Sequence, residues 1–176
     1  MRKFIALLIS TFSLLIFAEE NQSTSHIEKI VLGSGCFWGA EKGYEALNGV
    51  IDAVSGYADG KGVRANYREI TRFTNKFNPN NHAEVVEVTY NKNLISFEDL
   101  MIHYLESHDP TQLNRQGNDI GTQYRSIILF SNTSQQEKIT QLLTEYQSLL
   151  SKEGYGAIQT AVKPLTKFYE AENYLS

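Results

Sequence analysis

The single cysteine of this chain is the residue best placed, by type and setting, to do chemistry. Cys36 lies in the segment Gly-Ser-Gly-Cys-Phe-Trp at residues 33–38, between an apolar stretch and the start of a helical pattern. The first amides of a helix and the helix dipole favour a negative charge beside them. A thiolate is the nucleophilic form of cysteine, and such a setting can lower a thiol pKa from about 8.5 to roughly 3.5–7.5. We therefore expect Cys36 to be an exposed, reactive thiol with a lowered pKa, rather than a buried structural cysteine.

Two carboxylates could supply a proton next to this thiol. Glu84 stands where a polar loop enters an apolar strand, and Glu41 lies shortly after Cys36 on the predicted helix. A carboxyl group shielded by aromatic side chains has a raised pKa and can donate a proton near neutrality. Either carboxylate could instead be a solvated surface charge. The residues by themselves leave the choice between Glu84 and Glu41 open.

Aromatic side chains could shape a pocket around the thiol. Phe37 and Trp38 directly follow Cys36 and could form a wall for a small apolar group such as a methyl, or could be core aromatics at a helix start. A second polar loop, over residues 106–123, is rich in hydrogen-bonding side chains and leads to Tyr124. Tyr124 could point back toward the same pocket.

Composition excludes several classes of function. The net charge of -4 argues against a nucleic-acid partner. The four histidines have no metal-ligand spacing, and with one cysteine a zinc site is not expected. The glycines at 33 and 35 lack the third glycine of a dinucleotide-binding fingerprint. We expect no metal and no bound cofactor.

The N-terminus reads as a targeting segment. Two basic residues precede an apolar run from Phe4 to Ala18, which is shorter than the ~20 residues that span a membrane. The sequence predicts a signal peptide over residues 1–18, a flexible tail over 19–26 and one domain over 27–176. We expect an exported protein, periplasmic or extracellular. The alternative is an uncleaved N-terminal membrane anchor.

Strands and helices are expected to mix without strict alternation. Hydrophobic periodicity predicts strands over residues 28–32, 50–57, 83–90, 124–130 and 158–162. It predicts helices over 37–47, over 97–105 behind a cap at Ser96, and from a capping box at Ser134 to about 150. The long segments 62–82 and 106–123 read as loops. This pattern favours an α+β fold.

The segment Gly-Cys-Phe-Trp-Gly-Ala-Glu at residues 35–41 resembles the signature of the A-type family of peptide methionine-(S)-sulfoxide reductases. Four further segments resemble that family in the same order, at residues 54–58, 82–86, 108–126 and 168–172. The resemblance implies a two-layer αβ sandwich, with a plait-like mixed sheet and flanking helices. It also implies an enzyme that reduces methionine-(S)-sulfoxide, free or in proteins, and thereby repairs oxidised proteins. The segment at residues 62–81 is longer than the family pattern.

The resemblance also implies roles for individual residues. Cys36 matches the nucleophile that attacks the sulfoxide sulfur, and Glu84 matches the proton donor. Tyr124 and Tyr67 match the two tyrosines that hydrogen-bond the oxygen. The substrate-binding matches are Phe37 and Trp38, around the methyl group, and Asp119, which orients the substrate.

The lone cysteine bears on how the enzyme would be recycled. Attack on the sulfoxide leaves a sulfenic acid on Cys36. Many members of the family carry a resolving cysteine, and Thr71 stands near where some carry another cysteine. This chain resembles the single-cysteine type, which implies an external thiol such as a thioredoxin-like protein, glutaredoxin or glutathione, or dithiothreitol in vitro. We expect a monomer.

Two other classes of function compete with this reading. One is a different thiol enzyme, which would reduce peroxide or act as a cysteine hydrolase. A hydrolase needs a histidine base near the thiol, and the sequence does not place His82 or His108 there. The other is a non-catalytic protein that binds oxidised methionine.

Overall fold

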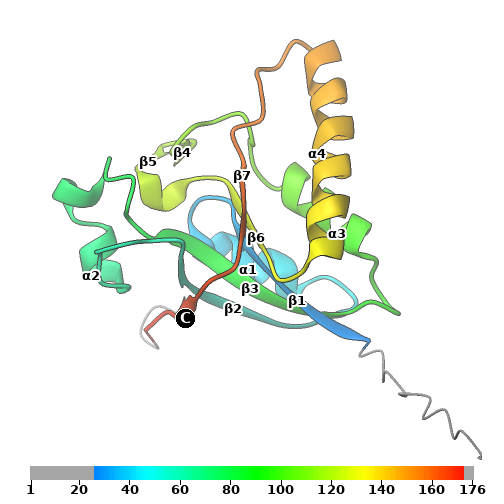
Figure 1. Cartoon of the computed structure of the whole chain (residues 1–176), viewed down its shortest axis with the longest axis horizontal. Coiled ribbons are helices and arrows are strands. Elements are labelled where there is room, and N and C mark those ends of the chain that lie inside the picture. Colours follow the sequence, from blue (N-terminus) through cyan, green and yellow to red (C-terminus); the bar gives the residue numbers. More distant parts are fainter. Residues whose placement is uncertain (1–25, 173–176) are drawn as a thin grey trace, which may run out of the picture.

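The computed structural model describes residues 26–172, which fold around one sheet (Figure 1). The predicted signal peptide and all but the last residue of the predicted flexible tail lie outside the described residues. Among residues 26–172, no helix combines the length and the apolar character needed to cross a membrane.

Six strands form the sheet, in the spatial order β7-β6-β1-β3-β2-β8. Their bounds are β1 (Ile27–Gly33), β2 (Val50–Ala58), β3 (Ala83–Asn91), β6 (Ile127–Phe130), β7 (Ala161–Pro164) and β8 (Phe168–Glu170). The pairing of β6 with β7 is parallel and the other four pairings are antiparallel. The central strands β1, β3 and β2 are the longest, and they carry the main core.

Three helices cover one face of this sheet. They are α1 (Phe37–Glu45), α3 (Phe97–Glu106) and α4 (Thr133–Lys152). Because side chains alternate along a strand, Leu32 and Val86 face the helices, where they pack in one cluster with Tyr44, Leu100 and Ile139. Residues one position away in each strand form a smaller cluster on the other face, with Leu165 and Phe168 beside it. The predicted α+β, two-layer fold is confirmed.

The two segments predicted as loops contain short elements. Residues 62–82 include α2 (Tyr67–Ile70) and the 3-10 helix η1 (Phe73–Asn75). Residues 106–123 include a hairpin of β4 (Arg115–Gln116) and β5 (Asp119–Ile120), and lead into the 3-10 helix η2 (Thr122–Tyr124). The backbone amide of Thr122 donates to the carbonyl of Lys76 at 2.8 Å, which joins the two segments. In Figure 1 they lie together at one end of the molecule, and α4 lies at the other.

Several predicted boundaries were wrong at the edges of the fold. The strand predicted over residues 124–130 begins at Ile127, because residues 122–124 turn in a 3-10 helix. The strand predicted over 158–162 lies at Ala161–Pro164, and β8 was not predicted. Strands as short as these carry too few residues for a period of two to be recognised, so pairing with β6 and β2 decides where they form.

The cap of α4 was also misplaced. The predicted capping box began at Ser134, but the side chain of Asn132 accepts the hydrogen bond from the amide of Gln135 at 2.9 Å. Asparagine and serine are both strong N-caps, so local residue preference does not separate the two positions. The buried side chain of Gln135 donates to the carbonyl of Lys29 at 2.9 Å, and this contact with β1 fixes the helix start.

Asn132→Ala should lower the free energy of unfolding by about 1 kcal/mol, because it leaves an amide of the first turn of α4 without its acceptor. Ser134→Ala, at an exposed position, is the matched control and should change stability by less than about 0.5 kcal/mol. Urea denaturation of both variants measures the difference. A larger loss for Ser134→Ala would show that the capping box is the true start of the helix.

Candidate active site

Cys36 occupies the N-cap of α1, directly after the turn that leaves β1. Its backbone is extended, with φ -60° and ψ 121°, and its side chain is exposed. Gly35 before it has φ +101°, and a Cβ there would lie 2.8 Å from the Cβ of Gln116 in β4. This left-handed, crowded position favours glycine, and the turn directs Cys36 toward the β4–β5 hairpin. The predicted exposed thiol at a helix start is confirmed.

Glu84 lies directly beneath the start of α1. Alternation along β3 turns it to the helix face, the same face as Val86, and its side chain is 1% exposed. One carboxylate oxygen, Oε2, accepts a hydrogen bond from the backbone amide of Phe37 at 3.2 Å. Burial raises the pKa of Glu84 to about 7, the amide of Phe37 partly opposes this rise, and the charge of Asp119 adds to it. At neutral pH this carboxyl group can therefore both give and take a proton.

The thiol pKa differs from the expectation. Partial desolvation raises the pKa of Cys36 above its usual value, and the negative charges of Glu84 and Asp119 raise it further. The backbone amides of Trp38 and Gly39 oppose the rise. The predicted lowering was wrong because desolvation of the sulfur, together with the charges of Glu84 and Asp119, outweighs the amides of Trp38 and Gly39. The first amide of α1, that of Phe37, donates to Glu84 instead.

Two tyrosine side chains lie close enough to Glu84 and Asp119 for the charges of these carboxylates to affect them. Tyr67 opens α2, and Tyr124 ends η2. Burial raises the pKa of both, to about 12 for Tyr124, and the negative charges of Glu84 and Asp119 raise them further. The charge of Cys36 contributes to the rise at Tyr67 as well. Both phenols therefore stay protonated at neutral pH and can donate a hydrogen bond to an oxygen atom.

Tyr67, Tyr124 and Asp119 line one pocket, with a volume of about 410 Å³. The rest of its lining comes from residues 71–76 and from residues 118–123: Thr71, Phe73, Lys76, Asn118, Ile120 and Gln123. A larger hollow of about 620 Å³ follows the outer surface of α4, but none of the predicted site residues lines it. Cys36 and Glu84 do not line this pocket, but the charges of both act on Tyr67, which places them next to it.

The two predicted aromatic wall residues are placed differently from each other. The ring of Phe37 is 1% exposed and packs in the main core, 5.8 Å from the ring of Tyr57. The ring of Trp38 is 50% exposed beside the thiol. Trp38 is therefore the one of the pair that presents an aromatic surface to solvent.

Glu41, the rival acid, has a structural contact instead. Its Oε2 accepts a hydrogen bond from the backbone amide of Ser55 at 2.8 Å, which ties α1 to β2. The two histidines that could have served as the base of a hydrolase, His82 and His108, also make hydrogen bonds away from the thiol. The ring nitrogens of His82 bond to the backbone of Gly60 and Val63, and those of His108 bond to Ser126 and the carbonyl of Tyr104.

Sequence reasoning missed two sets of residues that hold the site in place. Glu172 accepts hydrogen bonds from the hydroxyl of Tyr57 at 2.6 Å and from the backbone amide of Tyr67 at 3.1 Å. It thereby fixes the first residue of α2 against β2. In the sequence, residues 168–172 contribute to the family resemblance, but the resemblance implies no role for Glu172.

The second missed set supports the turn before the thiol. The buried hydroxyl of Tyr104 donates to the carbonyl of Gly33 at 3.1 Å, and it hydrogen-bonds Ser126 Oγ at 2.8 Å.

Arg125 holds the segment next to Tyr124. Its largely buried guanidinium donates to the carbonyl of Thr122 at 2.7 Å and forms an ion pair with Asp59 at 3.0 Å. Apart from the Arg125–Thr122 bond, these contacts join segments far apart in the chain, so no local sequence signal could have found them.

An exposed thiol, a carboxyl group that titrates near neutrality and two protonated phenols are groups with which a thiol enzyme could attack a substrate and protonate an oxygen atom. Comparison with known proteins agrees with this class. The family model for peptide methionine sulfoxide reductase matches residues 28–175. The peptide methionine sulfoxide reductase of Nautilia profundicola is 46% identical over 147 residues, which cover 83% of this chain and 79% of that protein. That of Saccharolobus solfataricus is 40% identical, over 84% of this chain and 78% of that protein.

Solved structures agree with the sequence comparison. Methionine sulfoxide reductase A of Corynebacterium diphtheriae has a TM-score of 0.78 and 36% identity, covering 87% of this chain and 74% of that one. Mxr1 from Saccharomyces cerevisiae, solved in complex with Trx2, has a TM-score of 0.59 and 26% identity, over 83% and 81% of the two chains. The chain belongs to the peptide methionine sulfoxide reductase family. It is an oxidoreductase that uses thiols to reduce methionine sulfoxide and repair proteins.

The raised pKa of Glu84 predicts a pH-dependent stability. Folding favours the protonated carboxyl, so its contribution is complete below about pH 4.5 and is lost as the pH rises through about 7. The difference amounts to roughly 3 kcal/mol. Glu84→Gln, which cannot ionise, should therefore be more stable than the wild type at pH 8, with the gap narrowing toward pH 5. Urea denaturation across this range measures both profiles, and parallel profiles would contradict the buried, proton-binding Glu84.

Proposed function

We propose that this enzyme reduces the S-epimer of methionine sulfoxide, free or in exposed peptide segments, through a sulfenic acid on Cys36. The observation that carries the proposal is the shared start of α1. There the exposed Cys36 thiol stands next to Phe37, whose amide is bound by a carboxyl group with a pKa of about 7. Such a pair can move a proton from a thiol to a substrate oxygen.

The proposed reaction has a simple balance. The Cys36 thiol gives its proton to the Glu84 carboxylate as its sulfur attacks the sulfoxide sulfur, and Glu84 returns that proton to the sulfoxide oxygen. The attack forms a bond between the two sulfur atoms. That bond and the bond between oxygen and the substrate sulfur then both break as oxygen bonds to the cysteine sulfur. Methionine leaves, and Cys36 carries a sulfenic acid. The substrate sulfur is reduced by two electrons and the cysteine sulfur is oxidised by two.

The remaining predicted site residues would hold the substrate. Tyr67 and Tyr124 would donate hydrogen bonds to the oxygen as negative charge develops on it. Trp38, with Phe37 packed beneath the same turn, would contact the methyl group. Asp119 would orient the backbone or amino group of the substrate from β5. The raised pKa values of both phenols and their place in one pocket with Asp119 support these assignments.

Recycling needs thiols from another molecule in this proposal. Cys36 is the single cysteine of the chain, so no second sulfur within it can resolve the sulfenic acid. An external thiol would attack the sulfenic sulfur and release water, and a second thiol would then cleave the mixed disulfide. The complex of yeast Mxr1 with Trx2 supports a thioredoxin-type reductant. Glutaredoxin with glutathione is the alternative.

We also propose that residues 1–18 are a signal peptide and that the enzyme acts in the periplasm or outside the cell. The basic start and short apolar run of the sequence support this proposal. Determining the N-terminal residue of the native protein in each cell fraction tests it. A full-length N-terminus in the membrane fraction would favour the anchored alternative.

Cys36→Ser should abolish reduction of N-acetylmethionine-(S)-sulfoxide with dithiothreitol. In the wild type, one equivalent of this substrate without reductant should add a single oxygen atom to Cys36, as seen by intact-protein mass spectrometry. The R-epimer is the matched control and should leave the mass unchanged. Turnover by Cys36→Ser, or substrate bound to the wild type without any oxygen transfer, would contradict the proposed reaction.

Glu84→Gln should slow the single-turnover reduction by about 10²–10⁴-fold, the range typical of a lost acid–base group. Glu41→Gln is the matched control, since its carboxylate bonds to Ser55 rather than to the start of α1, and it should lose less than about tenfold. Rapid-quench measurement of methionine formation compares the two. Equal losses would count against Glu84 as the proton donor.

A further inference from the structure

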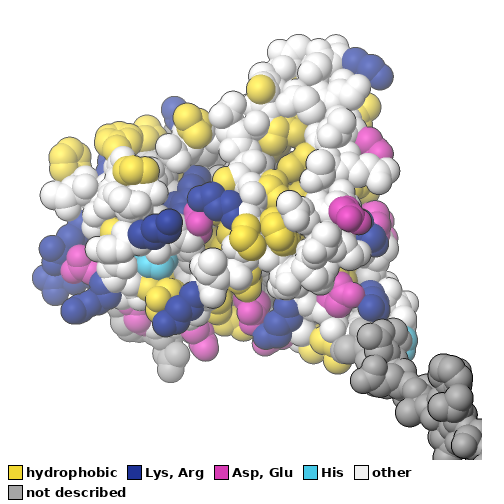
Figure 2. Space-filling view, in the orientation of Figure 1, with side chains coloured by type: hydrophobic (Ala, Val, Ile, Leu, Met, Phe, Trp, Pro, Cys, Tyr) yellow, Lys and Arg dark blue, Asp and Glu magenta, His cyan; other side chains and the backbone are white. Residues whose placement is uncertain are grey.

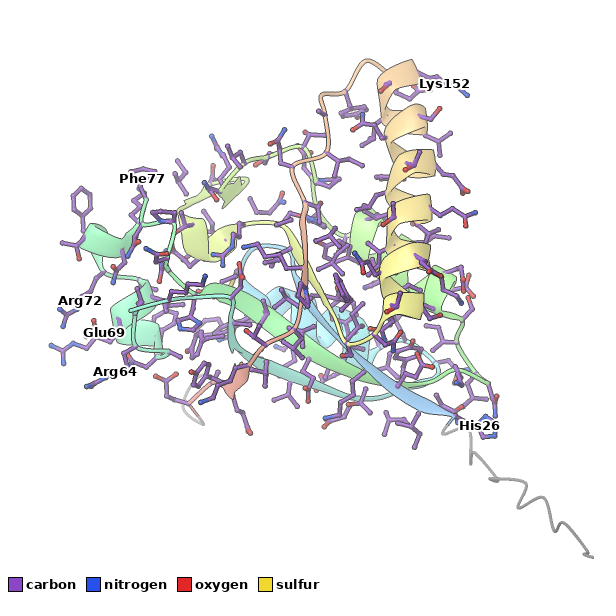
Figure 3. The ribbon with its side chains drawn as sticks, viewed as in Figure 1. His26, Arg64, Glu69, Arg72, Phe77 and Lys152 are labelled. Atoms are coloured by element: carbon purple, nitrogen blue, oxygen red, sulfur yellow. The ribbon has the colours of Figure 1, made fainter. Side chains whose placement is uncertain are left out.

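The segment of residues 61–77, next to the active-site pocket, is strongly basic although the protein is acidic overall. The chain has a net charge of -4, yet this segment holds one acid, Glu69, and five cations: Lys61, Arg64, Arg68, Arg72 and Lys76. Figure 2 shows dark-blue side chains gathered at the end of the molecule where α2 lies, and Figure 3 labels Arg64 and Arg72 there. Positive charge is therefore concentrated beside the site.

Most of these cations have no acidic partner among the residues that the structure describes. Arg72 forms an ion pair with Glu69 at 2.9 Å. Within residues 26–172, no carboxylate lies within ion-pair distance of the other four. Lys61, Arg64 and Arg68 are exposed. Their charges remain available to a molecule that binds across the pocket.

Large apolar side chains are exposed in the same place. Phe73 is 86% exposed and Phe77 is 68% exposed, and Figure 3 shows Phe77 at the outer end of this segment. Phe73 lines the pocket, and Ile120, which is 40% exposed, lines it from the β4–β5 hairpin. Exposed apolar groups gathered around a pocket mark a binding surface.

The segment is held in place rather than tethered only at its ends. The buried side chain of Asn81 donates to the carbonyls of Ile70 at 2.9 Å and Asn75 at 3.2 Å. The side chain of Asn75 in turn donates to the carbonyl of Glu69 at 2.7 Å. These bonds close the segment on itself, so the backbone that carries its exposed side chains needs little ordering when a ligand binds.

We propose that residues 61–77 form a docking surface for the oxidised polypeptide, and that they select methionine sulfoxide flanked by acidic and aromatic residues. This inference rests on the proposed function, because the oxidised side chain must enter the pocket lined by Tyr67 and Tyr124. An extended peptide advances about 3.3 Å per residue. Residues flanking the sulfoxide would therefore leave the pocket over Phe73 and Phe77 and come under the charges of Arg64 and Arg68. A free amino acid would use the pocket alone.

The experiment measures kcat/KM with dithiothreitol as the only reductant, so that no protein reductant can use the surface. The substrates are N-acetylmethionine-(S)-sulfoxide and three peptides with the same central sulfoxide, whose flanks are Glu-Phe, Lys-Phe or Glu-Ser. We expect the wild type to prefer the Glu-Phe peptide over the Lys-Phe peptide by about tenfold at low salt, and less at high salt. The Glu-Ser peptide should fall between them.

Variants of residues 61–77 test whether this segment causes the preference for acidic and aromatic flanking residues. The double charge reversal Arg64→Glu with Arg68→Glu should abolish or invert the Glu-Phe over Lys-Phe ratio, and Phe77→Ser should reduce the Glu-Phe over Glu-Ser ratio. Lys152→Glu, an exposed charge reversal at the far end of α4 (Figure 3), is the matched control and should leave both ratios unchanged. Because each readout is a ratio within one variant, a general loss of folded protein cannot imitate the result.

The possible outcomes distinguish a failure of the proposed docking surface from a failure of the proposed function. Equal kcat/KM for all three peptides, with N-acetylmethionine-(S)-sulfoxide still reduced, would overturn the docking surface and leave the proposed function standing. Failure to reduce any of the four substrates would overturn the proposed function itself. A second series of assays replaces dithiothreitol with thioredoxin. If the variants altered only the rate with thioredoxin and not the peptide ratios, the surface would belong to the reductant and the inference would be wrong.

Discussion

The hydrogen bond from the Phe37 amide to the buried carboxyl of Glu84 is the interaction on which the site depends. It joins the start of α1 to β3, so the residue before Phe37, Cys36, is held beside an acid from another strand. The bond also partly offsets the cost of burying a carboxyl group, which would otherwise titrate still further from its usual range. Without it, the carboxylate of Glu84 would lose the backbone donor that holds it beside the start of α1.

This arrangement divides one helix terminus between two groups that could both carry negative charge. The first amide donates to Glu84 and the next amides act on Cys36, and the charge of Glu84 raises the energy of the Cys36 thiolate. Near neutral pH the thiol therefore keeps its proton, whereas Glu84 is partly ionised and can accept one. A permanently ionised thiolate would attack well but would bring no proton for the oxygen. A thiol with a raised pKa, paired with such an acid, brings both the nucleophile and the proton to the same reaction.

The other side of the site is assembled by the two long segments that leave the sheet. They are joined by the Thr122–Lys76 bond and anchored by Arg125, and Glu172 holds the start of α2 from the C-terminal segment. The phenols and Asp119 are thus carried on elements with almost no core of their own. Their positions depend on polar contacts between segments, which are directional and leave little freedom for the pocket.

The sequence by itself determined the helix and strand pattern of the central fold, the exposed thiol at a helix start and, through its resemblance to a family, the residues that meet in the site. Strong local periodicity and the Gly35 turn encode these features. Only the tertiary structure buried Glu84 with a raised pKa and tied Glu41 to β2, raised the thiol pKa rather than lowering it, and placed Phe37 in the core. Each of these outcomes follows from burial and from charges on other strands, which lie far away in the chain and act only once the sheet has formed.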